Sequence, residues 1–87
     1  MVVLYGKEVQ RKLRKHQIPR EVWEDFRDAF LGMSVSQNFR LFDVKKMIAK
    51  GSYVYYRLRI RNYRALFHMD RENIYVEDIG PRGGVYR

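Results

Sequence analysis

The stretch that decides the fold runs from Tyr56 to Met69 and reads YRLRIRNYRALFHM. Apolar residues such as Leu58 and Ile60 alternate with arginines in its first half, and a second alternation starts after Asn62. A period of two residues is typical of a strand with one buried face. Arg61 and Asn62 stand where the two runs meet, so a two-residue turn there predicts a hairpin of antiparallel strands. Asn tolerates the positive φ of such a turn and Arg does not, which leaves a longer turn as the alternative.

In the two-residue register, Arg59 faces Arg64 across the hairpin. Two opposed arginines repel, at a cost of up to about 1 kcal/mol, and a bound anion reverses the sign. From Phe39 to Leu66 the chain has eight Lys or Arg residues and one acid, Asp43, which favours a phosphate site on this face. The alternative is that the guanidinium groups extend into water or are neutralised by acids such as Glu77. The opposite, apolar face contains Tyr56, Leu58, Ile60, Tyr63, Ala65, Phe67 and Met69.

Other segments supply the remaining elements. An apolar strand is expected at 1–5, a basic helix from Lys7 to about His16, a second helix from Pro19 to Gly32 and a strand at 73–79. The segment from Ser34 to Lys50 has weak periodicity and is expected to be irregular or partly helical. The prediction is an α+β fold in the order β-α-α-β-β-β. Two N-terminal helices pack on one face of a twisted, mainly antiparallel sheet of four to five strands, and the other face forms a basic, concave site.

Composition limits the classes of function. The chain has 87 residues, 18 Lys or Arg, 10 Asp or Glu, a net charge of +8 and no cysteine. This length suits a single domain, 1–87, in which the glycine-rich 80–87 is expected to be a mobile tail. The charge favours a polyanionic partner such as nucleic acid. No apolar run reaches the length of a membrane span or signal peptide, and no metal-ligand spacing is seen, so we expect a cytoplasmic protein without metal or other cofactor.

Four segments together resemble the RelE toxins of the RelE/ParE superfamily. In that family a Tyr-Arg-x-Arg strand, a Gly-Asp-Tyr-Arg hairpin and a C-terminal Arg followed by Tyr recur in this order. The matching segments here are YRLRI at 56–60, NYR at 62–64, IGPR at 79–82 and Tyr86. The resemblance covers nearly the whole chain, and Arg61 and Asn62 depart from the Gly-Asp of the family hairpin.

The resemblance implies the toxin of a type II toxin–antitoxin system. Such a toxin is a ribosome-dependent endoribonuclease that cleaves mRNA in the ribosomal A site and so inhibits translation. The RNA 2′-hydroxyl attacks the phosphate and no metal is needed. By the same resemblance, the catalytic residues are Arg59, Arg64, Arg82 and Tyr86. Further RNA contacts are expected from Arg57, Lys45, Lys46, Lys50, Arg61 and Arg87.

The expected partners are the ribosome with its 16S rRNA, mRNA, and an acidic RelB-like antitoxin that covers the arginines or displaces the tail. Two other functions stay open. One is inhibition of DNA gyrase by a ParE-like protein, and the other is RNA binding by a catalytically inactive relative. The arginine-rich strands argue against gyrase inhibition, since that function does not need a cluster focused on a phosphate.

Overall fold

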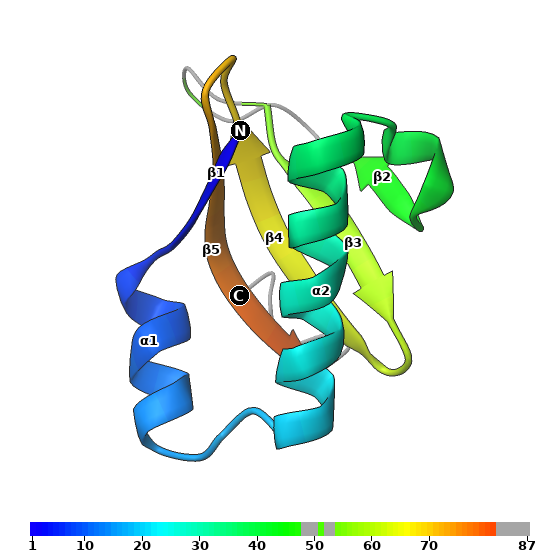
Figure 1. Cartoon of the computed structure of the whole chain (residues 1–87). Coiled ribbons are helices and arrows are strands. Elements are labelled where there is room, and N and C mark those ends of the chain that lie inside the picture. Colours follow the sequence, from blue (N-terminus) through cyan, green and yellow to red (C-terminus); the bar gives the residue numbers. More distant parts are fainter. Residues whose placement is uncertain (48–50, 52–53, 82–87) are drawn as a thin grey trace.

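The chain folds into one mixed sheet with two helices, shown in Figure 1. The structure is a computed structural model and describes residues 1–47, 51 and 54–81. The elements are β1 (Val2–Tyr5), α1 (Lys7–Arg14), α2 (Arg20–Ser36), the 3₁₀ helix η1 (Phe39–Leu41), β2 (Val44–Lys46), β3 (Tyr56–Ile60), β4 (Tyr63–Met69) and β5 (Asn73–Pro81). The strand order is β1-β5-β4-β3-β2, and β1 is parallel to β5 while the other pairs are antiparallel. The predicted α+β class is confirmed.

The hairpin of β3 and β4 has the predicted register. Arg59 is the partner of Arg64, and Ile60 is the partner of Tyr63. The turn therefore holds two residues, and the alternative of a longer turn was wrong. Arg61 itself takes the left-handed conformation, with φ 56°. This conformation costs an L-residue roughly 1–2 kcal/mol, which the packing of the two strands offsets.

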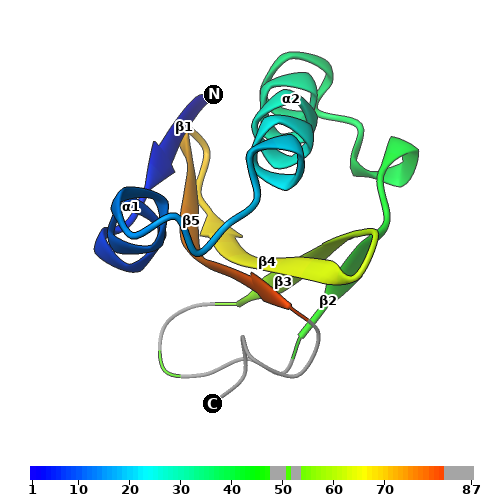
Figure 2. The same cartoon turned by 90° about the horizontal axis from the view of Figure 1, so that it is seen from below.

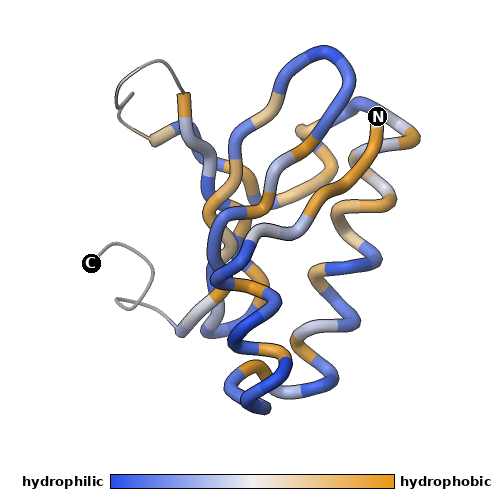
Figure 3. The backbone as a smooth tube through the Cα atoms, turned by 90° about the vertical axis from the view of Figure 1, so that its left-hand side faces the viewer, coloured by the Kyte–Doolittle hydropathy of each residue, from blue (hydrophilic) through white to orange (hydrophobic). Residues whose placement is uncertain are grey.

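The core lies between the sheet and α2, which crosses one face of it (Figure 2). Phe26 and Phe30 of α2 are fully buried, and Phe30 meets Phe67 of β4 edge to face, with ring centroids 5.2 Å apart. Apolar and polar residues alternate along the coil of α2 in Figure 3, and the apolar residues Val22, Phe26, Phe30 and Met33 belong to the core. α1 lies beside β5 and adds Val9 and Leu13 to the same cluster.

The second helix is longer than predicted. It continues past Gly32 to Ser36, because Gly32 serves packing rather than termination. A Cβ at this position would lie 3.1 Å from Cζ of Phe42, closer than ordinary van der Waals contact, so glycine lets that ring pack tightly against the helix. Gln37, with φ 54°, ends the helix. The segment predicted to be irregular thus holds the last helical turn, η1 and the edge strand β2.

The last strand is also longer than predicted. Gly80 and Pro81 were assigned to a mobile tail, and this was wrong, because they pair with Arg64 and Tyr63 at the end of β5. Positions 82–87 lie outside the described residues. Within the described ranges, neither helix combines the length and apolar character that crossing a membrane requires.

Candidate nucleic-acid interface

Four cations gather on the side of the sheet that faces away from α2. Lys45 of β2 is the partner of Arg57 of β3, and Arg59 is the partner of Arg64. Their strand neighbours Leu58 and Ala65 are buried in the core, so alternation turns the cations to the outer side. We call this set, Lys45, Arg57, Arg59 and Arg64, the arginine face. Lys45 and Arg59 are exposed, and Arg57 and Arg64 are half-buried.

Three cations of the arginine face, Lys45, Arg57 and Arg59, have no acid of the described chain within ion-pair distance. Nε of Arg57 is buried and has no hydrogen-bond acceptor within the described ranges. A buried donor without an acceptor costs about 1–3 kcal/mol, and an anion with several oxygens supplies acceptors and opposite charge together. The arrangement is suited to a phosphate.

Glycine borders the arginine face on its other side. Gly80 of β5 is the cross-strand partner of Arg64 and carries no side chain. The row across the three strands β3, β4 and β5 therefore presents Arg59, Arg64 and then bare backbone. This leaves Arg64 beside a neighbour that adds neither bulk nor charge of its own.

Two of the predicted RNA contacts lie elsewhere. Arg61 reaches toward α2, where its guanidinium lies 3.1 Å from Asp25 and 3.6 Å from Glu21. Lys46 is the partner of Tyr56, whose ring packs in the core, so alternation places Lys46 on the helix-covered side of the edge strand. Neither residue joins the arginine face. Arg61 points away from the arginine face because its left-handed turn conformation directs the side chain toward the acids of α2. The local sequence pattern does not show either feature.

Four other predicted site residues, Lys50, Arg82, Tyr86 and Arg87, lie outside the described residues. The two arginines of β3 and β4 that are expected to bind phosphate are thus described, whereas the two C-terminal catalytic positions implied by the resemblance to RelE are not.

An aromatic row flanks the arginine face. His68 of β4 is buried, its ring stacks on Tyr75 with centroids 4.8 Å apart, and it meets Tyr55 edge to face. Its Nε2 lies 2.8 Å from Oε1 of Glu77. Glu77 therefore pairs with His68, and it forms no ion pair with Arg57 or Arg59. His68 stands four residues from Arg64, or about 13 Å along the strand.

A hydrogen-bonded turn holds the far end of this row. The hydroxyl of Tyr75 donates to Asp70, at 3.1 Å, and accepts from the side-chain amide of Asn73, at 2.9 Å. Backbone N–H groups of Glu72 and Asn73 also bind Asp70, and these bonds lower the pKa of its carboxyl. Sequence reasoning missed this network, although the Asp at the start of the turn is a typical signal.

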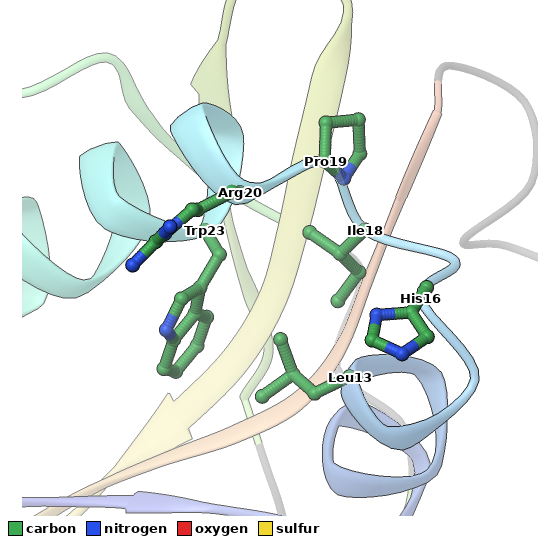
Figure 4. Close-up of a pocket in the computed structure, with 6 residues that line it drawn as sticks. All are labelled: Leu13, His16, Ile18, Pro19, Arg20 and Trp23. Atoms are coloured by element: carbon green, nitrogen blue, oxygen red, sulfur yellow. The ribbon is translucent and has the colours of Figure 1, made fainter.

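A shallow apolar pocket lies away from the arginine face, between the two helices (Figure 4). Its lining comes from the end of α1, the connection and the start of α2: Leu13, His16, Ile18, Pro19, Arg20 and Trp23. No cluster of three or more His, Cys, Asp or Glu side chains suited to a metal ion occurs among the residues that the structure describes.

The class of fold is a small α+β domain in which a mixed five-stranded sheet carries helices on one side and an open basic surface on the other. A solved structure with this architecture is an archaeal RelE–RelB complex from Pyrococcus horikoshii OT3. Its matching chain is 23% identical, with a TM-score of 0.73, over 95% of this chain and 96% of that one. No family model and no curated protein matches the sequence. The RelE fold implied by the resemblance is confirmed.

Proposed function

We propose that this protein is the toxin of a toxin–antitoxin system and cleaves mRNA on the ribosome. The observation that carries the proposal is the cross-strand pair of Arg59 and Arg64, with Arg57 and Lys45 beside it. A fold gains nothing by setting two arginines opposite each other on an open face, since the pair repels. A phosphodiester between them turns this repulsion into attraction.

The chemistry is transfer of the phosphoryl group to the neighbouring ribose. The RNA 2′-oxygen attacks the adjacent phosphorus, a new O2′–P bond forms, and the P–O5′ bond breaks. The products are a 2′,3′-cyclic phosphate and a 5′-hydroxyl end, and the proton lost from O2′ is balanced by the one gained at O5′. Negative charge builds on the phosphorane oxygens, where the preorganised guanidinium groups of Arg59 and Arg64 stabilise it.

The roles of Arg82 and Tyr86 in the proposal come from the resemblance alone. Arg82 stabilises charge on the phosphorane or the leaving group, and Tyr86 stacks on a base or moves a proton. Arg57 and Lys45 hold the neighbouring backbone of the RNA, with Lys50 and Arg87 as further contacts. An RNA contact by Arg61 or Lys46 has less support, because both lie off the arginine face.

Proton transfer is therefore assigned to Tyr86 rather than to His68. The ring of His68 is buried against Tyr75, and its Nε2 is hydrogen-bonded to Glu77. His68 also lies four positions along β4 from Arg64. A tyrosine acts as a base near pH 7 only where cations lower its pKa, and an arginine cluster provides such cations.

The proposed protein partner is an acidic antitoxin. The structural neighbour was solved as a complex of RelE with RelB. A chain with a net charge of +8 and an open arginine face is complementary to an acidic segment that covers the cations. Binding there would exclude RNA from the same surface.

The decisive experiment incubates the protein with ribosomes programmed with a defined mRNA and maps the mRNA ends. We expect cuts within the A-site codon that leave 2′,3′-cyclic phosphate ends, and none on free mRNA. Gyrase-dependent DNA breaks in a parallel assay would favour the ParE-like alternative. RNA binding without cuts would favour an inactive relative.

A further inference from the structure

Among the described residues, no strand pairs with one of the two sides of the C-terminal half of β5. β1 pairs with β5 only as far as Tyr5, opposite Val76, and a bond from Gly6 N to the Val76 oxygen ends that contact. Within the described residues, β5 from Asp78 to Pro81 pairs with β4 alone. α1 runs along this open edge in Figures 1 and 2. The open stretch includes Gly80, the neighbour of Arg64.

Lys12 of α1 fills part of the place of the missing strand. Its Nζ donates to the backbone oxygen of Ile79 at 3.0 Å and to Oδ1 of Asp78 at 2.7 Å. The same Asp78 oxygen accepts the N–H of Ile79 at 2.9 Å. The side chains of Lys12 and Asp78 are only 16% and 20% exposed, so water screens this ion pair less than a surface pair.

The contact falls at a β-bulge. Phe67 is the partner of Val76 but Leu66 is the partner of Asp78, so β5 holds one extra residue, Glu77, at this point. The bulge lets Val76 and Ile79 both face the core, where both are fully buried, and it sets Gly80 opposite Arg64. Bulges bend and twist a strand and leave its ladder locally incomplete, so they need other support.

We propose that Lys12 is a positioning residue for the arginine face: through Asp78 and the Ile79 carbonyl it holds the open end of β5 against β4, beside Arg64. The effect on cleavage rests on the proposed function, whereas the effect on the strand does not. Without the ammonium group, Asp78 and the Ile79 oxygen lose their shared donor, and the stretch from Asp78 to Pro81 opens locally more often.

The test compares three variants by amide hydrogen exchange and by the rate of mRNA cleavage at saturating ribosome. Lys12→Met keeps the length of the side chain and removes its donors. Lys12→Arg restores a charged donor. Arg11→Met removes one charge from the same helix at a half-buried residue whose ion pair is with Glu8, and which reaches Asp78 of β5 only through a weaker electrostatic interaction without an ion pair or hydrogen bond. This last variant is the matched control for net charge.

We expect Lys12→Met to speed exchange about tenfold at the β5 residues 78–80 and at their β4 partners, with little change at the buried end of β5 near Ile74. The maximal cleavage rate of Lys12→Met should also fall about tenfold, while its KM for programmed ribosomes changes less than about threefold. Lys12→Arg should recover most of both losses, and Arg11→Met should behave as wild type.

Three results would overturn the inference. Unchanged exchange at 78–80 in Lys12→Met would show that the contact does not hold the strand. A uniform rise in the exchange rate over all strands would mean that Lys12 contributes only to the global stability of the fold. Loss of activity in Arg11→Met equal to that in Lys12→Met would assign the effect to charge. If the wild type cleaves no mRNA, the proposed function fails, and the exchange measurements still test the role of Lys12 in holding β5.

Discussion

The two faces of the β3–β4 hairpin differ in the partners of their side chains: one face packs in the core, and the other carries arginines. On the helix-covered face, Leu58, Ala65 and Phe67 are buried against α2 and each other. On the outer face, Arg57 and Arg59 stand without an ion-pair partner among the described residues. Arg61, only two positions further on, has two carboxylates. The chain thus has acids available for an arginine, yet none of them forms an ion pair with Arg57 or Arg59, which suits the proposed binding of an external anion.

The largest effect is expected on the helix-covered face. Phe67→Ala removes a fully buried ring that stacks on Tyr56 and meets Phe30 edge to face. Such a truncation costs about 3–5 kcal/mol, a large part of the 5–15 kcal/mol that holds a typical domain folded. Urea denaturation should show a much lower midpoint. A loss below about 1 kcal/mol would contradict the packing described for this face.

The outer face should give the opposite pattern. Arg59→Ala and Arg64→Ala should each leave the unfolding midpoint nearly unchanged and slow cleavage by at least about 10²-fold. If both hold one phosphate, the double variant should lose less than the sum of the two free-energy losses.

Arg71→Ala, an exposed arginine of the turn before β5, is the control for charge and should stay active. Additive losses in the double variant would indicate two separate anion sites. Unfolding of either single variant would count against the assigned outward orientation.

A smaller effect is expected at Tyr5, a polar group on the buried side. Its hydroxyl is buried without a hydrogen-bond partner among the described residues, and its ring meets Trp23 edge to face. Burial raises the pKa of Tyr5 from 10.0 to about 12. The folded state therefore holds this proton more tightly, and the resulting stability is present below pH 10 and is lost as pH rises toward 12.

Tyr5→Phe should remove this contribution to the loss of stability between pH 10 and 12. At pH 7 the free energy of unfolding should stay the same or rise by up to about 1 kcal/mol. Tyr75→Phe is the matched control, since that hydroxyl has two partners and its loss should destabilise the protein. Unfolding curves at pH 7, 10 and 11.5 measure both. A Tyr5→Phe protein that is less stable at pH 7 would mean that the hydroxyl has an acceptor.

The smallest effect separates Arg61 from the arginine face. Exposed ion pairs contribute about 0–1 kcal/mol, so Arg61→Ala should lower stability slightly and leave cleavage unchanged. Because position 61 has φ 56°, Arg61→Gly should be about 1 kcal/mol more stable than Arg61→Ala. Thermal unfolding of the two variants measures the difference. A cleavage loss comparable to that of Arg59→Ala would return Arg61 to the RNA-binding surface.

The sequence by itself determined the two faces of the hairpin. The alternation of Leu58 and Ile60 with arginines, resumed after Asn62, fixes which side chains share a face, because the period of a strand is two residues whatever surrounds it. The same pattern predicted the pairing of Arg59 with Arg64. These predictions use neighbours within one hairpin, so no distant contact was needed.

Tertiary structure alone decided what lies around that hairpin. The pairing of Arg61 with α2, the extension of β5 through Gly80 and the bulge supported by Lys12 each join residues far apart in sequence. Lys12 and Asp78 stand 66 positions apart, and nothing in either local pattern marks them as partners. Such contacts depend on how the helices and the sheet pack. Burial of the apolar faces sets the distances between these elements, and those distances decide which charged side chains meet.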